Sequence, residues 1–278
     1  MADTESVVID YEKYRVRAAQ PVALADMLTS DTQGFKREAA RKIHKRNLKL
    51  LAELQERLYA QSRQSLLVVL QAMDTGGKDS TIRKLCERLN PQGCHVASFK
   101  APSDNELSHD FLWRVHQKVP SAGYIGIFNR SHYEDVLIVR VHDWASPETI
   151  ESRYQRINEF EQLLADRGTR IVKIMLNISR EYQLQRLRLR LIHPEKHWKF
   201  NPADLAEREH WDDYMQAYEI ALNRCSNEQS PWYVIPAEKR WFRDAVVSQL
   251  VVNTLIDMNP QFPAPDFDPA DYPPESLK

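Results

Sequence analysis

Short apolar runs alternate with amphipathic segments over most of the chain. Five short runs predict strands, and the first is continuous in apolar character, which is typical of a strand that is buried on both faces. They lie at residues 66–71, 94–99, 124–128, 170–178 and 232–236. Because helical segments separate them, they indicate βαβ units and therefore a parallel sheet with helices on both faces.

Helices are predicted where apolar positions recur at helical spacing. These segments are 32–61, 78–89, 105–119, 146–168, 179–192, 202–225 and 239–258. Ser146 is expected as an N-cap with Pro147 after it and Gly168 past the end, and Ser179 is expected to cap the helix that follows. The stretch "YEDVLIVRV", residues 133–141, is ambiguous on composition, because its β-branched residues favour a strand whereas its neighbours permit a helix.

The first long helix has a basic N-terminal half. The cationic residues are Lys36, Arg37, Arg41, Lys42, Lys45 and Arg46. We interpret them as a solvated helix face, and a dedicated anion-binding surface is the alternative. At the other end of the chain, residues 259–278 are rich in proline and acidic, which predicts a tail without a core of its own.

Composition restricts the class of protein. The chain has 278 residues and a net charge of -1, so it can bury a full core but is not expected to bind nucleic acid, and any anion site must be a local concentration of Lys and Arg. Cys86, Cys94 and Cys225 lack metal-ligand or redox spacing and are expected to be reduced thiols. The sequence contains no apolar signal core and no run long enough to span a bilayer, so we expect a cytoplasmic protein without a membrane partner.

The segment "QAMDTGGKDSTI", residues 71–82, follows the first predicted strand and has the character of a phosphate-binding loop. Gly76 and Gly77 let the backbone approach an anion closely, and the N–H groups at a helix start point towards it. Lys78 adds a mobile cation that can follow a phosphate. A glycine-rich turn without a ligand is the alternative, but the strand, the lysine and the helix all fall in the expected order.

This loop departs from the common pattern G-x-x-x-x-G-K-[ST] at Ala72 and Asp79. Since the usual magnesium-holding hydroxyl is missing, a carboxylate must replace it, and Asp74 is the candidate. Ser80 and Thr81 come too late for that position. They are expected to cap the helix rather than to contact a phosphate oxygen.

A second polar group follows the third predicted strand in "IGIFNRSHYED", residues 125–135. Both strand ends belong to the carboxyl edge of the sheet, where open α/β folds bind ligands. Asn129 stands where a second metal-binding carboxylate is expected, Arg130 can meet phosphate oxygens, and Glu134 with Asp135 follows. His132 is expected to make a structural hydrogen bond rather than to bind phosphate.

A third group is basic. Arg186 and Arg190 are four residues apart and share a helix face, so they could close over phosphates as a lid, but a helix of surface arginines explains the spacing equally well. The loop that follows adds Lys196, Trp198 and Lys199, which suits a mobile segment that excludes water.

Four segments closely resemble the polyphosphate kinase 2 family: "AMDTGGKDSTI", "FKAPSDNELSHDFLWRVH", "GYIGIFNRSHYEDVLIVRV" and "RLIHPEKHWKFNPADLAEREHWDDYMQAYE". The likeness runs from about residue 30 to about residue 260. It implies an α/β P-loop kinase-like three-layer sandwich with about five parallel strands, a helical lid and an N-terminal helical extension, and it implies that residues 133–141 are helical. The expected division is 1–60 for the extension, 61–258 for the kinase domain with its lid at about 180–212, and 259–278 for the tail.

The resemblance implies phosphoryl transfer from inorganic polyphosphate to nucleotides, with Mg²⁺ or Mn²⁺ as the cofactor. The pattern "FNRSHYE" resembles the class III branch, which phosphorylates both AMP and ADP to give ATP, and the family favours homo-oligomers, dimers or tetramers. The rival hypotheses are an ATP-dependent nucleoside monophosphate kinase of the same fold and a non-enzymatic nucleotide- or polyphosphate-binding protein.

The resemblance also implies roles for individual residues. Catalytic roles are expected for Asp74, Lys78, Arg130, Glu134, Arg186 and Arg190, and metal-ligand roles for Asp74, Asn129 and Glu134. Phosphate contacts are expected from Thr75, Gly76, Gly77, Lys78, Asp79, Ser80 and Arg130. Closeness in sequence to the strand ends, rather than the resemblance, adds Arg83, Lys84, Lys100 and Arg140 as residues of a polyphosphate groove. Nucleotide contacts are expected from Lys100, Asn129, Arg130, His132, Glu134 and Asp135.

Overall fold

The computed structural model describes residues 8–17 and 20–276; residues 1–7 and 18–19 of the predicted extension, and 277–278 of the tail, lie outside the described residues. Five strands form one parallel sheet in the order β2-β3-β1-β4-β5. They are β1 Ser65–Gln71, β2 Cys94–Ser98, β3 Ile125–Asn129, β4 Thr169–Asn177 and β5 Trp232–Pro236. Each end lies within one residue of its expected position, so the strand predictions are confirmed.

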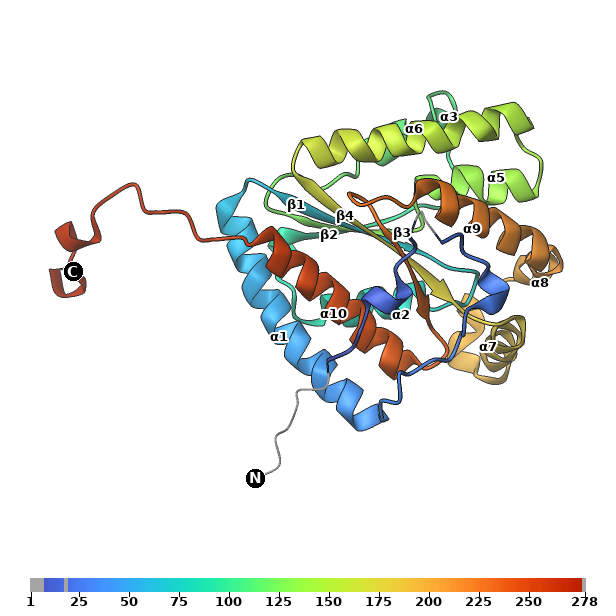
Figure 1. Ribbon diagram of the computed structural model, residues 1–278, viewed down its shortest axis with the longest axis horizontal. Helices are drawn as coiled ribbons and strands as arrows, with labels where there is room; N and C mark the ends of the chain where they lie inside the picture. Colours follow the sequence, from blue (N-terminus) through green and yellow to red (C-terminus); the bar gives the residue numbers. More distant parts are fainter. Residues whose placement is uncertain (1–7, 18–19, 277–278) are drawn as a thin grey trace.

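Helices cover both faces of this sheet (Figure 1). One layer holds α1 Arg37–Gln61, α2 Lys78–Leu85 and α10 Arg240–Met258, and the other holds α5 Ile138–Val141, α6 Pro147–Asp166 and α9 Trp211–Cys225. The long helices α1 and α10 run side by side in the same direction, and His44 of α1 is 3.0 Å from the hydroxyl of Ser248 on α10. The result is the predicted three-layer arrangement.

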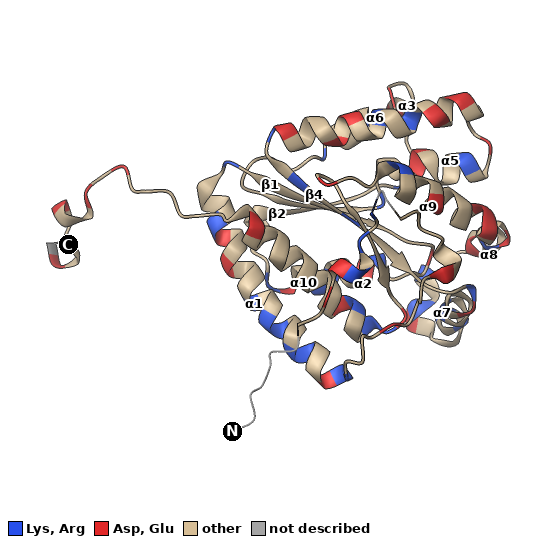
Figure 2. Ribbon diagram, in the orientation of Figure 1, with Lys and Arg blue, Asp and Glu red and all other residues tan. Residues whose placement is uncertain are grey.

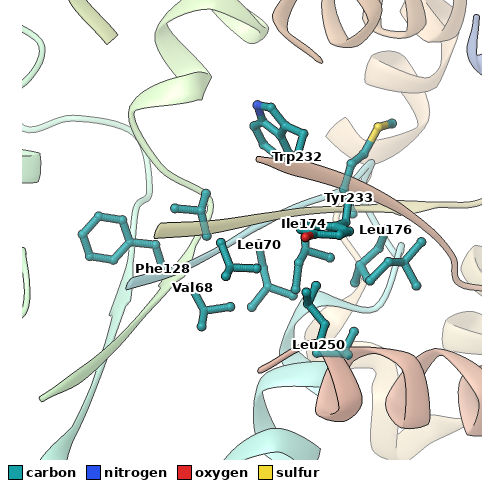
Figure 3. Close-up of a cluster of buried hydrophobic side chains, with 14 of the residues drawn as sticks. Val68, Leu70, Phe128, Ile174, Leu176, Trp232, Tyr233 and Leu250 are labelled. Atoms are coloured by element: carbon teal, nitrogen blue, oxygen red, sulfur yellow. The ribbon is translucent and has the colours of Figure 1, made fainter. Parts of the chain in front are cut away.

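The core lies between these layers. Figure 3 shows side chains from four strands and from α10 gathered in one cluster. Leu70, Phe128, Ile174, Trp232 and Leu250 are all nearly inaccessible to solvent. Their continuous burial explains why the strands are apolar without alternation, because both faces of a parallel sheet are covered.

The remaining elements are short or belong to the carboxyl edge. They are α3 Asp104–Leu107, α4 Trp113–His116, α7 Arg180–Ile192 and α8 Ala203–Glu207, with 3-10 turns at Glu12–Tyr14, Leu24–Asp26, Cys86–Arg88, Pro91–Gly93, His132–Val136, Pro194–Lys199, Arg208–His210, Pro269–Asp271 and Pro274–Ser276. The 3-10 turn at His132–Val136 and α5 make the ambiguous stretch 133–141 helical, as the resemblance implies. Beyond Met258 the tail runs away from the body of the protein (Figure 1).

Three helix predictions are wrong in extent. The segment 105–119 is not one helix, because polar side chains compete for its backbone groups. Ser103 and Glu106 cap α3 reciprocally, Ser108 donates back to Asn105, and Asp110 accepts from the N–H of Leu112. The segment 202–225 is divided into α8, a 3-10 turn and α9, and the first long helix begins at Arg37 rather than at Thr32.

The predicted helix starts at Ser146 and Ser179 are confirmed. The hydroxyl of Ser146 accepts from the N–H of Thr149, and that of Ser179 accepts from the N–H of Tyr182. Gly168 follows α6 with φ of 87°. Within the described part of the chain, no helix is both long enough and apolar enough to cross a bilayer.

Candidate active site

The loop between β1 and α2 wraps around a small space at the carboxyl edge of the sheet. Thr75 and Gly77 have positive φ values of 64° and 99°, which turn the chain sharply into α2. A Cβ on Gly77 would lie 2.3 Å from Nη1 of Arg243, so a larger residue here would require this guanidinium to shift as well as an unfavourable φ. Lys78 is nearly buried and donates from Nζ to the carbonyl of Ala72 at 2.7 Å.

Ser80 and Thr81 do not cap α2, so that prediction is wrong. Gly77 occupies the N-cap position without a side-chain cap. Both hydroxyls instead donate back to the carbonyl of Gly77, at 2.8 Å and 3.0 Å. A residue already inside the first helical turn reaches the carbonyl three or four positions before it more easily than a free N–H. The N–H groups at the start of α2 therefore remain available to an anion.

Two polar bridges join this loop to the end of β3. Arg130 Nη2 donates to Asp74 Oδ1 at 2.8 Å, and Asn129 Nδ2 donates to Asp79 Oδ1 at 2.8 Å. Sheet register explains the proximity, because Leu70 of β1 pairs with Asn129 of β3. Arg130 has a φ of 62°. This left-handed conformation is uncommon for a side chain other than glycine, and such conformations cluster at functional sites.

The charges in this cluster shift one another's pKa values. Burial raises the pKa of Asp74, but the positive charges of Lys78 and Arg130 outweigh that effect, so the pKa is lowered and the carboxylate stays ionised. Burial lowers the pKa of Lys78, and the neighbouring carboxylates only partly oppose this. Glu134 lies 3.6 Å from Arg130 Nη1, and the charges of Glu134 and Asp74 raise the pKa of Arg130 against the effect of burial.

A cavity of about 730 Å³ lies over the loop, and we call it the loop cavity. It is lined by ten cationic side chains and two carboxylates, so it has a large excess of positive charge. The cations are Lys78, Arg83, Lys100, Arg130, Arg186, Arg190, Lys196, Lys199, Arg240 and Arg243, and the carboxylates are Asp74 and Asp79.

A second cavity, of about 190 Å³, lies on the other side of the Asp74–Arg130 pair, and we call it the acidic cavity. Three further carboxylates line it, those of Glu134, Asp204 and Glu207. Its wall also includes Tyr214 and Tyr218 and the apolar side chains of Leu137 and Ile138. The two cavities therefore share the ion pair and differ in charge.

The helix α7 places its side chains over both cavities. Gln183 Nε2 donates to the backbone carbonyl of Asp74 at 3.0 Å. Arg190 Nη1 donates to the carbonyl of Lys199 and to Asp204 Oδ2, at 2.8 Å and 2.9 Å. Arg186 lines the loop cavity, where burial and the neighbouring cations lower its pKa. The exposed Arg188 lines neither cavity.

Four residues that the sequence placed at the site lie elsewhere. His132 is buried with Nε2 3.2 Å from Glu161, which confirms its expected structural hydrogen bond and takes it away from both cavities. Asp135 lies 3.5 Å from Arg153, and Arg140 lies 3.9 Å from Glu151. Lys84 pairs with Glu87 at 2.8 Å and faces a neighbouring cavity. The proximity of a residue to a motif in the sequence does not determine where its side chain points.

Sequence reasoning missed six residues that line the loop cavity, and three of these, Ser98, Phe99 and Ala101, lie at or just after the end of β2. Arg240 and Arg243 come from the first turn of α10, and Tyr182 comes from α7. A signal was available for the two arginines. They follow β5, and the residues that follow a parallel strand lie at the same sheet edge as the phosphate loop.

The model of the polyphosphate kinase 2 family matches residues 34–263. The chain belongs to the polyphosphate kinase 2 family. An AMP/ADP-polyphosphate phosphotransferase of Meiothermus ruber is 48% identical over 257 residues, which cover 92% of this chain and 96% of that relative. An ADP-polyphosphate phosphotransferase of Rhodopseudomonas palustris is 42% identical over 268 residues, 92% of this chain and 93% of the relative.

Comparisons with solved structures agree with these sequence matches. The crystal structure of polyphosphate kinase 2 from Arthrobacter aurescens TC1 superposes with a TM-score of 0.90 at 45% identity, covering 94% of this chain and 93% of that one. A putative polyphosphate kinase 2 from Pseudomonas aeruginosa PA01 superposes with a TM-score of 0.77 at 27% identity, over 86% of this chain and 49% of that one. The predicted P-loop kinase-like sandwich is confirmed.

A kinase family of this kind requires a divalent cation, and the residues of the loop cavity fit one. No group of three or more His, Cys, Asp or Glu side chains with metal-binding geometry occurs among residues 8–17 and 20–276. Mg²⁺ in phosphoryl-transfer sites is held by one or two carboxylates together with phosphate oxygens and water, so such a group is not needed. Asp74 and Asp79 both line the loop cavity, beside Asn129.

Proposed function

We propose that this polyphosphate kinase 2 protein transfers the terminal phosphoryl group of inorganic polyphosphate to AMP and ADP, reversibly. The observation that carries the proposal is the contrast in charge between the two cavities that meet at Asp74 and Arg130. The loop cavity is suited to a polyanion. The acidic cavity is suited to a group that has hydroxyls, ring edges and less charge.

The loop cavity supports polyphosphate as the phosphoryl donor. Its ten cations greatly outnumber its carboxylates, and its apolar lining is limited to a few side chains such as Phe99 and Ala101. A nucleoside triphosphate donor would need an apolar slot for its base. A chain of phosphates needs cations along its whole length.

The acidic cavity supports a nucleotide as the acceptor. Glu207 accepts from Tyr214 and lies 3.0 Å from His142, so it is held in place, whereas Glu134 reaches the cavity from the end of β3. Carboxylates accept hydrogen bonds from ribose hydroxyls or exocyclic amines, and Leu137 with Ile138 offers apolar surface to a base. Glu134 orients the acceptor in this proposal.

The reaction is an in-line displacement without a covalent enzyme intermediate. An oxygen of the terminal phosphate of AMP or ADP attacks the end phosphorus of polyphosphate, a new P–O bond forms, and the shortened chain leaves with the electron pair of the broken P–O bond. Lys78, Arg130 and Arg186 stabilise the negative charge that spreads over the transferred group. The lid helix α7 excludes water, which would otherwise compete with the nucleotide.

Mg²⁺ is the proposed cofactor, with Mn²⁺ as a substitute. When bound, it neutralises phosphate oxygens as the charge develops. Asp74 is its proposed principal ligand, since its pKa is lowered and its carboxylate faces the loop cavity. Asn129 and Asp79 are linked by a hydrogen bond, so they would reach the ion directly or through water. Glu134, the remaining predicted ligand, lines the acidic cavity rather than the loop cavity.

One incubation tests the function. Purified protein with Mg²⁺ is given AMP and either long-chain polyphosphate or ATP, and the products are separated by chromatography. ADP followed by ATP with polyphosphate as the only phosphoryl donor is the expected result. The Asp74→Asn variant serves as the control for a contaminating kinase.

Two results would contradict the proposal. ADP formed only with ATP would make the protein a nucleoside monophosphate kinase. Tight nucleotide binding without turnover for either donor would make it a binding protein. A cytoplasmic location, homo-oligomerisation and the absence of nucleic-acid or membrane partners remain predictions of the sequence.

A further inference from the structure

A third cavity, of about 440 Å³, adjoins the loop cavity at the point where α1, α2 and α10 begin, and we call it the outer basin. The two cavities share four residues, Ser80, Arg83, Arg240 and Arg243. They are therefore neighbouring compartments of one continuous depression. The proposed reaction uses the loop cavity and the acidic cavity, and it assigns no role to Arg37, Arg41 or Lys239 of the outer basin.

The outer basin is strongly cationic. Its lining has seven cationic side chains and two carboxylates; the cations are Arg37, Arg41, Arg83, Lys84, Lys239, Arg240 and Arg243. Both carboxylates are already engaged. Asp244 accepts two hydrogen bonds from Arg243, at 2.9 Å and 2.6 Å, and Glu238 accepts from the N–H of Ser179 at 3.0 Å.

Most of these cations have no internal partner. Arg37, Arg41 and Lys239 are exposed, and none of them makes an ion pair within the described part of the chain. His44 is half-buried at the floor, and burial lowers its pKa, so it adds little charge at neutral pH. The surplus of positive charge is therefore open to a ligand from solvent.

The placement of these cations opposes the stability of their own helices. Arg37 and Arg41 are like charges four residues apart in the first turns of α1, and Arg240 begins α10, whose first turn has no acidic residue. Cations at a helix N-terminus interact unfavourably with the helix dipole, and like charges four apart repel. Figure 2 shows Lys and Arg along the N-terminal half of α1, beside α2 and the start of α10. A bound polyanion offsets both costs.

We propose that the outer basin binds the part of a polyphosphate chain that lies beyond the reacting end. The inference rests on the proposed function and adds a binding site for the distal phosphates. The chain leaves the loop cavity past Arg83 and Arg240 and reaches Arg37 and Arg41 on α1. These residues position long chains and do not touch the transferred phosphoryl group.

The other exit from the loop cavity is less suited to a polyanion. A cavity of about 360 Å³ shares Ser98, Phe99, Lys100 and Ala101 with it. Its remaining cations are Arg114 and Lys118, and Arg114 is nearly buried, 3.8 Å from Glu106. Charge therefore directs the chain towards α1.

The basic face of α1 continues past the outer basin. Lys42, Lys45, Arg46 and Lys49 line a shallow depression of about 320 Å³ with Arg88. Arg41 and Lys45 are four residues apart and so share a helix face, which joins the two depressions. The alternative interpretation of the basic helix, an anion-binding surface, is thus the one that we adopt.

A double variant, Arg37→Gln with Arg41→Gln, tests the outer basin. The matched control, Arg63→Gln with Arg167→Gln, removes two exposed arginines that precede β1 and β4 at the opposite edge of the sheet. Phosphorylation of ADP is measured with linear polyphosphates of increasing length, from chains that fit the loop cavity to long chains. Thermal unfolding of both variants verifies that they are folded.

The expected result depends on chain length. In the R37Q/R41Q variant, the KM for long chains rises about threefold to tenfold, in keeping with the loss of two exposed charge contacts. The KM for the shortest chains, the KM for ADP and kcat stay unchanged, and the control variant keeps the length dependence of the unmodified protein. Added salt reduces the advantage of long chains in the unmodified protein, since exposed charges are screened.

Other outcomes would overturn the inference. Equal changes in KM for short and long chains, or no change for any length, would show that the outer basin does not bind polyphosphate. Polyphosphate would still be the phosphoryl donor in either case. Turnover of the unmodified protein with ATP but with polyphosphate of no length would instead contradict the proposed function itself, and the outer basin with it.

Discussion

Arg130 and Asp74 form a 2.8 Å ion pair that is the common wall of a cationic cavity and an acidic cavity. The two residues follow neighbouring strands, and a left-handed backbone at Arg130 turns its guanidinium back towards the loop. A phosphate held on one side of this pair and a nucleotide held on the other would meet at it. The pair is therefore the expected place of phosphoryl transfer.

Replacing Asp74 with alanine should lower kcat roughly hundredfold or more. The site would lose the carboxylate that is proposed to hold Mg²⁺ beside the transferred phosphate. The measurement is steady-state turnover of AMP with polyphosphate at saturating Mg²⁺. Thermal unfolding verifies that the variant is folded, which is expected because Asp74 is partly exposed. Near-normal turnover would remove Asp74 from the proposed metal site.

Arg186 and Arg188 offer a matched test of the lid, because they lie two positions apart on α7 and only Arg186 lines the loop cavity. We expect Arg186→Ala to lower kcat/KM for polyphosphate by about tenfold or more through lost charge stabilisation. Arg188→Ala should leave it within about twofold, as is usual for exposed residues that lie away from a functional site. Equal losses in the two variants would mean that α7 acts through its general charge.

Alanine substitutions at Gly77 and Gly34 can distinguish the cost of a positive φ from the steric cost of an added Cβ in the phosphate loop. Both have positive φ, but a Cβ on Gly34 meets nothing within 4 Å, whereas one on Gly77 would meet Arg243 at 2.3 Å. Gly34→Ala should destabilise the protein by about 1 kcal/mol, the cost of the left-handed conformation.

Gly77→Ala should cost more than Gly34→Ala and should also raise the KM for polyphosphate, since it displaces a guanidinium of the loop cavity. Chemical denaturation gives the free energy of unfolding, and initial rates give KM. A similar loss of stability in both variants, without a change in KM, would show that Arg243 has room to move aside.

Asp135 should make stability depend on pH. Burial raises its pKa from 3.8 to about 6, although Arg153 partly opposes the shift. The folded protein thus holds this proton more tightly than the unfolded chain. The contribution to stability is complete below pH 3.8 and is lost as the pH rises through about 6.

The Asp135→Asn variant has no carboxyl group to deprotonate at this position, so it does not lose this stability as the pH rises. It should raise the free energy of unfolding at pH 7 by up to about 3 kcal/mol, from about two pKa units at 1.36 kcal/mol each. Near pH 4 the gain should be close to zero. Denaturation of both proteins at several pH values measures this, and a gain independent of pH would assign the effect to packing.

The sequence predicted the fold well because its signals are local. Each strand lies in a short run rich in apolar residues, and each confirmed cap is a serine next to the helix that it begins, such as Ser146 and Ser179. The exception shows the limit of such signals. Residues 105–119 have helical spacing, but the side chains of Ser103, Ser108 and Asp110 bind the backbone and divide the segment.

The composition of the loop cavity was predictable only in part. Asp74 and Lys78 follow β1 and Arg130 follows β3, and the ends of parallel strands meet at the carboxyl edge of the sheet, so their convergence could be expected. Asp135 could not be distinguished from them by position, yet it lies 3.5 Å from Arg153 and lines neither cavity. The direction of a side chain depends on backbone angles that one sequence does not specify.

The sequence by itself determined the order of strands and helices, the glycine loop before α2 and the basic character of α1, because apolar periodicity and short motifs act between residues near one another in the chain. Only the tertiary structure decided that Arg243 lies against Gly77 and that the starts of α1 and α10 line one basin beside the loop. Those residues are far apart in the sequence, and a charged side chain does not indicate its partner. Packing of α1 along α10 brings them together, and that contact depends on the whole core.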